Sequence, residues 1–360
     1  MSKRIESVDL LRGFTIAAMI LVNTPGTWSS VYKPLLHAEW NGLTPTDLIF
    51  PFFLFIVGIS IYFAYKNKSN DALVYKKILI RSVKLIGLGI FLNIFLPYYP
   101  FIKDFDTFRI PGVLQRIGIV FFISSILYIN FNWKILVTIS IAILIGYWFI
   151  LGFLPFSDGT LPTFERAANN WANYIDLNIL GNHMWQSDYD PEGIFSTLPS
   201  IVTCISGILI GKLLDNNIGV LRLFILSLLL LSVGYLFHMV FPINKALWSS
   251  SFVIVTSGWA TLILTIIYYF RDVKNFKFGT IFKYLGINAI TIYFLSSFIS
   301  KTMYLTKLGE SNLHGYLYET IFVQSFFTDN FSSFLYALSV VIFYAGLALY
   351  MFRKNIFIKV

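Results

Sequence analysis

Long apolar runs recur along the whole chain, and they constrain its fold more than any other feature. Each run is about 18 to 25 residues long, which is enough for an α-helix to cross about 30 Å of hydrocarbon. Of the 360 residues, 57% are hydrophobic and only 12% are charged, whereas soluble domains are about 25% charged. The sequence therefore predicts an all-α fold, a polytopic bundle of transmembrane helices.

We predict about ten spans in a single domain over residues 1–360. The first apolar run contains Asp9, Arg12 and Asn23, so it is expected to stay as a span rather than to be a cleaved signal peptide. Between the spans, residues 302–330 include an amphipathic stretch, YLYETIFVQSFF, of the kind that lies at a membrane interface. The predicted spans are 8–26, 44–65, 77–96, 112–130, 134–154, 194–213, 219–240, 248–270, 280–301 and 331–352.

Lysine and arginine are unevenly divided between the two sides of this bundle. With a cytoplasmic N-terminus, the inside segments hold eighteen of these cations and the outside segments eight, and Arg12 is counted with neither. Because cytoplasmic loops are enriched in Lys and Arg, we predict that both termini are cytoplasmic. The loops 27–43, 155–193 and 302–330 then face outward. The net charge of +9 is explained in the same way, so no nucleic-acid partner is expected.

Several common kinds of site are not indicated. The single cysteine, Cys204, lies in an apolar run and excludes an intrachain disulfide or a site of several cysteines. No H-x-x-x-H spacing suggests a metal, and no Walker or G-x-G-x-x-G motif suggests a nucleotide loop. We therefore expect no bound metal.

The loop after the first span gathers polar groups at a membrane edge. His37 is followed by Glu39 and Trp40, and Asp47 stands where the next apolar run begins. An imidazole accepts and donates a proton near neutral pH, so His37 is a candidate acid–base group. Asp47 either orients that ring or caps its own helix. Asn23, at the end of the first span, either caps that helix or polarises a reacting group.

A second group of polar residues lies in the outer loop 155–193. Acids beside aromatic rings are typical of carbohydrate or amine binding, although a solvated acidic loop has the same composition. The candidate acceptor-binding residues are His183, Asp188, Asp190 and Glu192 of this loop, together with Glu39 and Trp40 of the loop that carries His37. Toward the cytoplasm, Arg12 either pairs with Asp9 on its helix or meets a phosphate, and the bases Arg81 and Lys84 either bind an anionic ligand or face anionic lipid. Gln115 and Arg116 stand at the start of the predicted helix 112–130, where the arginine is either a membrane anchor or a site residue.

Six segments, in family order, make the chain resemble the heparan-α-glucosaminide N-acetyltransferase family: ESVDLLRGFTIAAMILVNTPG, LLHAEWNGLTPTDLIFPFFLFIVGIS, RIPGVLQRIG, YDPEGIFSTLPSIVTCISGILIG, INKALWSSSFVIVTSGWA and YLGINAITIY. The resemblance implies an acyltransferase that moves an acetyl group from cytosolic acetyl-CoA to an amino sugar on the opposite side. It places the family's active-site histidine at His37, with matching residues at Asn23 and Asp47. Asp190 and Glu192 fall on the acceptor side, and a homodimer is expected.

We expect neither the extra N-terminal luminal domain nor the additional helix of the family's lysosomal enzyme. As a bacterial inner-membrane enzyme, the protein would act on a periplasmic amino sugar or glycan. His37 would be the general base or a covalent acetyl carrier, with Asp47 or Glu39 orienting its ring and Asn23 stabilising the oxyanion. Arg12, Arg81, Lys84 and Arg116 are candidates for the phosphates of CoA. Two alternatives stay open: a proton-coupled amino-sugar transporter, and a lipid-linked glycan flippase or an O-acyltransferase of an envelope glycan.

Overall fold

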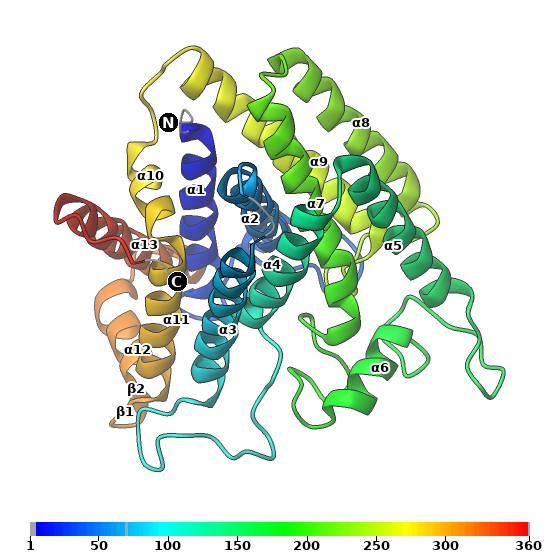
Figure 1. The fold of residues 1–360 in the computed structure, drawn as a ribbon. Coiled ribbons are helices and arrows are strands. Elements are labelled where there is room, and N and C mark those ends of the chain that lie inside the picture. Colours follow the sequence, from blue (N-terminus) through cyan, green and yellow to red (C-terminus); the bar gives the residue numbers. More distant parts are fainter. Residues whose placement is uncertain (1–4, 69–70, 359–360) are drawn as a thin grey trace.

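The computed structural model describes residues 5–68 and 71–358, which form a bundle of α-helices with one small β-hairpin (Figure 1). The helices are α1 (Glu6–Asn23), α2 (Ile49–Tyr65), α3 (Ala72–Ile94), α4 (Val113–Asn130), α5 (Trp133–Phe153), α6 (Trp171–Leu180), α7 (Ile194–Asp215), α8 (Val220–His238), α9 (Ser250–Tyr268), α10 (Thr280–Ile287), α11 (Ala289–Leu305), α12 (Leu313–Leu317) and α13 (Asp329–Arg353). The strands are β1 (Lys307–Leu308) and β2 (Ser311–Asn312), and short helical turns are η1 (Lys33–Leu35), η2 (Pro45–Leu48), η3 (Tyr269–Val273) and η4 (Tyr318–Phe322).

A helix or helix pair lies at each of the ten predicted spans. In the described part of the chain, seven helices are long and apolar enough to cross a membrane, namely α2 with η2, α4, α5, α7, α8, α9 with η3, and α13. Helices α1 and α3 carry more charged residues and are not among the seven. The count of ten spans and the cytoplasmic termini stay predictions. Three cations of the orientation count, Lys3, Arg4 and Lys359, lie outside the described residues.

The predicted span 280–301 is not one straight helix. It is broken between α10 and α11, whose axes differ by 82°. Asn288 stands at the break, where its side-chain amide donates to the carbonyl oxygen of Ile356 (3.0 Å) and its amide oxygen accepts from the backbone N–H of Ile358 (3.1 Å). These bonds tie the break to the C-terminal segment, at a place where the apolar pattern alone predicted one continuous helix.

The centre of the bundle is packed through small residues. A Cβ atom added to Gly58 of α2 would lie 1.9 Å from the carbonyl oxygen of Cys204 in α7, and one added to Gly207 of α7 would lie 1.9 Å from that of Phe55 in α2. The backbones of α2 and α7 therefore touch, as small residues permit between membrane helices. This contact places the start of α7 beside the start of α2.

The two long connections lie at one end of the bundle. In Figure 1 the helix α6 of the 155–193 connection and the hairpin β1–β2 of the 302–330 connection are both at the bottom, and the N-terminal end of α1 is at the top. This arrangement agrees with the prediction that both connections face the same side and that the N-terminus faces the other.

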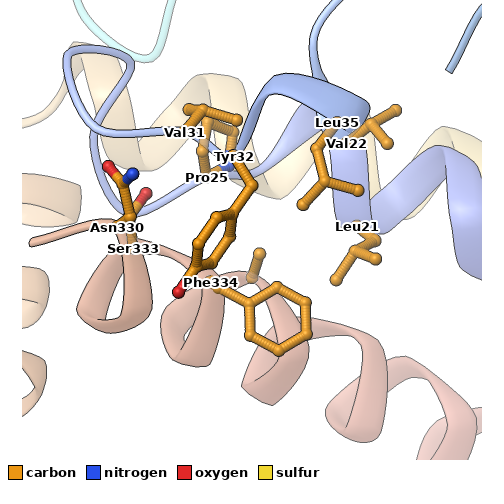
Figure 2. A pocket seen from close by; sticks show the side chains of 10 residues that line it. Leu21, Val22, Pro25, Val31, Tyr32, Leu35, Asn330, Ser333 and Phe334 are labelled. Carbon is orange, nitrogen blue, oxygen red and sulfur yellow. The ribbon is translucent and has the colours of Figure 1, made fainter. Parts of the chain in front are cut away.

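The loop between α1 and α2 is anchored on α13. The backbone N–H of Gly26 donates to the carbonyl oxygen of Ser333 (3.1 Å), and the ring of Tyr32 meets that of Phe334 edge-on at 6.2 Å. Figure 2 shows these side chains around a residual cavity of about 10 Å³, which is about the space of one water molecule. The loop is therefore packed in place before it reaches His37.

Candidate active site

His37 and Asp47 form a hydrogen-bonded pair at the start of α2. The Nδ1 atom of His37 lies 2.7 Å from Oδ1 of Asp47. Asp47 is 1% exposed, whereas the imidazole is 48% exposed. A carboxylate only accepts hydrogen bonds, so Nδ1 carries the hydrogen of this bond, and Nε2 is the ring nitrogen left to exchange a proton. A buried acid that fixes the tautomer of an accessible imidazole is the arrangement required of a general base.

The second oxygen of Asp47 caps the helix. Its Oδ2 accepts from the backbone N–H of Thr44 (2.9 Å), from the Thr44 hydroxyl (2.9 Å) and from the backbone N–H of Ala38 (3.1 Å). The bonds with Thr44 belong to a capping box around η2. The two interpretations of Asp47 are therefore compatible, because one carboxylate oxygen caps the chain and the other holds the ring.

Lys245 approaches the same imidazole from the loop between α8 and α9. Its Nζ lies 3.1 Å from Nε2 and 3.2 Å from Nδ1 of His37. The neighbouring Asn244 donates from its side-chain amide to Oδ1 of Asn41 (3.1 Å), and the backbone N–H of Gly42 donates to the carbonyl of Ile243 (2.8 Å). These bonds join the two loops. We call His37, Asp47 and Lys245 the histidine site.

Asp190 and Glu192 are buried and bound by one arginine. The guanidinium of Arg109 donates to both oxygens of Asp190 (2.8 and 2.5 Å) and to Oε2 of Glu192 (2.5 Å). Burial alone would raise the pKa of Glu192, but the nearby charges of Arg109, Arg116 and Lys245 lower it below its ordinary value. Glu192 is thus favoured in its ionised form, and both acids predicted to bind the acceptor are already paired with Arg109.

Arg116, predicted for the cofactor, lies beside these acids. It is 1% exposed, and its Nη2 donates to the carbonyl of Gly193 (3.0 Å) and to the hydroxyl of Ser196 (2.5 Å). Its Nε and Nη1 are buried and without a hydrogen-bond partner among the described residues. The guanidinium stacks over Trp248 at 5.1 Å. Arg116 therefore belongs structurally with the polar residues near the start of α7.

The other residues predicted to bind the acceptor hold loops together or are exposed. Trp40 donates its indole N–H to the carbonyl of Phe164 (2.9 Å), and Nδ1 of His183 bonds to the carbonyl of Phe108 (2.8 Å). Asp188 pairs with Arg166 at 2.6 Å on the surface. The side chain of Glu39 is exposed and makes no ion pair in the described part of the chain. These positions stay predictions as acceptor contacts.

Asn23 and Gln115 lie away from the hydrogen bonds of His37. Asn23 is the last residue of α1 and is exposed, and its side chain makes no hydrogen bond within the described ranges. Gln115 is buried, donates to the carbonyl of Ile110 (3.0 Å) and packs against Gly89. Its observed contacts hold the loop before α4 onto α3.

A second feature lies toward the other end of α1 and α2. A cavity of about 610 Å³ is lined by Arg12, Lys77 and Arg81, and we call it the arginine cavity. Its walls are otherwise mostly apolar, and the break between α10 and α11 contributes Gly286–Ile290. Binding pockets for small molecules range from about 300 to 1,000 Å³. The remaining predicted base, Lys84, is exposed and does not line the cavity.

Inside the arginine cavity the two arginines are held differently. Arg12 donates to Asp9 (2.9 Å) and to the hydroxyl of Ser60 (2.9 Å). Arg81 stacks over Phe121 at 4.8 Å, and its buried Nε lacks a hydrogen-bond partner among the residues described. Both expectations for Arg12 are therefore consistent with its position, because it pairs with Asp9 and also lines the cavity.

Three residues of these sites were not predicted from the sequence as site residues. Lys245 and Arg109 were counted only as outer cations, and Lys77 only as an inner one. Lys245 lies in the segment INKALW, which was noticed as a motif but not as part of a site. It is 208 positions from His37 in the chain, so no local spacing connects the two residues.

Comparison with known proteins identifies the family. Residues 4–223 match the family model described as "Heparan-alpha-glucosaminide N-acetyltransferase, catalytic". The proteins named heparan-alpha-glucosaminide N-acetyltransferase from Mus musculus and Homo sapiens are each 32% identical over 81% of this chain. The alignments cover 53% and 52% of those proteins, so the chain spans about half the length of the curated relatives it matches. The chain belongs to the heparan-alpha-glucosaminide N-acetyltransferase family.

Proposed function

We propose that this protein transfers an acetyl group from acetyl-CoA to the amino group of an amino sugar or glycan, with His37 as the general base. The observation that carries the proposal is the 2.7 Å bond between His37 and the buried Asp47, within the region that matches the family's catalytic model. The names of the two relatives support the reaction class, an N-acetyl transfer.

The reaction requires proton transfer at both reactants. The amine nitrogen forms a bond to the acetyl carbonyl carbon as the bond from that carbon to the CoA sulfur breaks. The amine proton passes to Nε2 of His37, and the departing thiolate receives a proton in turn. Alternatively, Nε2 takes the acetyl group first and the amine attacks acetyl-imidazole. In both cases Asp47 stabilises the positive charge that develops on the ring.

The arginine cavity supports the placement of acetyl-CoA. Its cations suit the phosphates of CoA, and its apolar walls suit the pantetheine chain. Four of its lining residues, Phe53, Val57, Ser60 and Ala64, follow one face of α2. Phe53 is six residues after Asp47, so the cavity ends roughly 9 Å along the helix from the histidine site. An elongated donor is therefore a suitable occupant.

The location of the two reactants follows from the predicted orientation. We propose that the arginine cavity opens to the cytoplasm of a bacterial inner membrane and that the histidine site faces the periplasm, where the acceptor binds near Asp190 and Glu192. A homodimer is part of the same proposal, because the family resemblance implies it.

Acetyl transfer by the purified protein is the decisive test. Labelled acetyl-CoA and glucosamine are incubated with wild type and with His37→Ala, and the N-acetylated product is measured by mass spectrometry. Wild type is expected to form the product and His37→Ala is not. Uptake of an amino sugar into proteoliposomes, without release of CoA over a panel of amino sugars, would refute the transferase. A trappable acetyl-enzyme with ping-pong kinetics identifies His37 as the acetyl carrier, and sequential kinetics identify it as the base.

A further inference from the structure

Lys245 and Asp47 bracket the imidazole of His37. Oδ1 of Asp47 lies 2.7 Å from Nδ1, and Nζ of Lys245 lies 3.1 Å from Nε2. A carboxylate can only accept a hydrogen bond, and an ammonium can only donate one. Nζ also lies 3.2 Å from Nδ1, so it stands beside both ring nitrogens and not along the lone pair of Nε2 alone. Asp47 therefore sets the hydrogen on Nδ1, and Lys245 places a second charged group against the ring.

The charge of Lys245 opposes that of Asp47. The carboxylate by itself favours an imidazolium, because an opposite charge stabilises the protonated ring. An ammonium at 3.1 Å disfavours the same imidazolium. The ring therefore keeps the orienting bond of Asp47 without being held in the protonated form, which would be unable to accept a proton.

Two carboxylates act on the ammonium of Lys245. Burial lowers the pKa of Lys245 below its ordinary value, and the charges of Glu192 and Asp47 offset only part of that effect. Its backbone is fixed by the joined loops, since Trp248 N–H donates to the Lys245 carbonyl at 3.1 Å. The charged groups that face Lys245 or His37 are Asp47, Arg109, Arg116 and Glu192, and Glu39 is exposed in the same loop as His37.

We propose that Lys245 is a positioning residue that holds His37 in its neutral Nδ1–H form, ready to accept the proton of the acceptor amine. The consequence for turnover rests on the acetyl transfer proposed above. The protonation state of His37 does not depend on that transfer, so it can be measured separately.

Carbethoxylation by diethyl pyrocarbonate measures the protonation state directly, because only the neutral imidazole reacts. The rate at the peptide that contains His37 is followed by mass spectrometry as a function of pH, which separates it from His183, His238 and His314. In Lys245→Met the midpoint of this profile is expected about one pH unit above that of wild type. Lys245→Arg keeps the charge and is expected to move the midpoint less. A variant that only changes how easily the reagent reaches His37 alters the plateau rate and leaves the midpoint unchanged.

A matched control is Lys307→Met, which removes an exposed lysine that makes no ion pair among the described residues. Its midpoint should equal that of wild type. If Lys245→Met does not fold, Lys245→Gln removes the same charge with a polar side chain. An unshifted midpoint in a folded Lys245→Met or Lys245→Gln variant overturns the proposal.

The pH profile of kcat/KM for acetyl transfer separates this inference from the proposed function. If wild type transfers acetyl and the acidic limb of Lys245→Met lies at higher pH, both stand. If wild type transfers acetyl but neither the limb nor the carbethoxylation midpoint moves, Lys245 is not the positioning residue and the acetyltransferase remains. If wild type transfers no acetyl group, the proposed function fails, and carbethoxylation still decides the role of Lys245.

Discussion

The histidine site and the arginine cavity use charged residues in opposite ways. At the histidine site the imidazole, the carboxylate and the ammonium lie within hydrogen-bonding distance, and Asp47 is fully buried. In the arginine cavity the cations border about 610 Å³ of space, and one buried atom of Arg81 has no hydrogen-bond partner in the described chain. The first arrangement holds one imidazole between a carboxylate and an ammonium, and the second leaves room and an unused donor for an anionic ligand.

His37→Ala is expected to have the largest effect of these variants, because it should abolish acetyl transfer at the histidine site and leave CoA binding in the arginine cavity. We expect acetyl transfer to fall by roughly 10³-fold or more, because the proton acceptor is lost. Binding of labelled CoA to the purified variant should stay within about twofold of wild type, because His37 does not line the arginine cavity. Residual activity close to wild type would show that another group accepts the proton.

Asp47→Asn is expected to lower kcat/KM by roughly 10- to 100-fold, as loss of a residue that orients an essential ligand or base commonly does. The asparagine oxygen still accepts from Thr44, so thermal unfolding should change little. Thr44→Ala is the matched control, since it removes one hydroxyl of the capping box and keeps the bond between His37 and Asp47. It should cost about 1 kcal/mol of stability with a smaller loss of activity. Equal losses of activity in both variants would mean that the cap alone matters.

Arg81→Gln tests whether the arginine cavity binds acetyl-CoA. It should raise KM for acetyl-CoA by about tenfold with little change in kcat, because loss of one charged hydrogen bond costs about 1.5 kcal/mol or more in binding. Lys84→Gln, on the same helix but exposed and away from the cavity, should leave both constants unchanged. Identical behaviour of the two variants would exclude the arginine cavity as the donor site.

The smallest expected effect concerns stability near the histidine site. Asp176 of α6 accepts from the backbone N–H groups of Ile194 (2.8 Å) and Phe195 (3.3 Å) at the start of α7, and burial raises its pKa to about 6. The folded protein therefore holds this proton more tightly than the unfolded chain, whose ordinary value is 3.8. The protonated carboxyl group of Asp176 makes its whole contribution to the free energy of unfolding below pH 3.8, and this contribution is lost as the pH rises through about 6.

Asp176→Asn keeps an acceptor for α7 and removes the ionisation. Relative to this variant, wild type should lose on the order of 1 kcal/mol of unfolding free energy between pH 4 and pH 7, measured by thermal unfolding in detergent. A parallel pH dependence in both proteins would show that Asp176 remains ionised throughout this range.

Much of the fold was predictable because apolar periodicity is a local property of the sequence. Every predicted span coincides with a helix or a helix pair, and His37 and Asp47 are ten positions apart in a single loop, so their contact was within reach of local reasoning. The break at Asn288 was not predicted, since it depends on bonds to residues near the far end of the chain.

The rest of the site depends on contacts between distant segments. The acids Asp190 and Glu192 were predicted to lie on the acceptor side, and their pairing with Arg109 was not predicted because it joins positions 81 and 83 residues apart. Lys245 reaches His37 only because Asn41 and Asn244 join two loops. Arg116 was predicted to bind the phosphates of CoA because of its residue type, and its observed neighbours follow from the packing of α4 against the start of α7.

The C-terminal segment has a consequence for biogenesis. Ile358 lines the arginine cavity opposite residues of α1 and α2, and its backbone is tied to Asn288. The histidine site uses residues 37 to 245, so a ribosome can release all of its parts while the last helices are still being made. The lining of the cavity is complete only when residue 358 has been synthesised, so a nascent chain contains every residue of the histidine site before it contains every residue that borders the cavity.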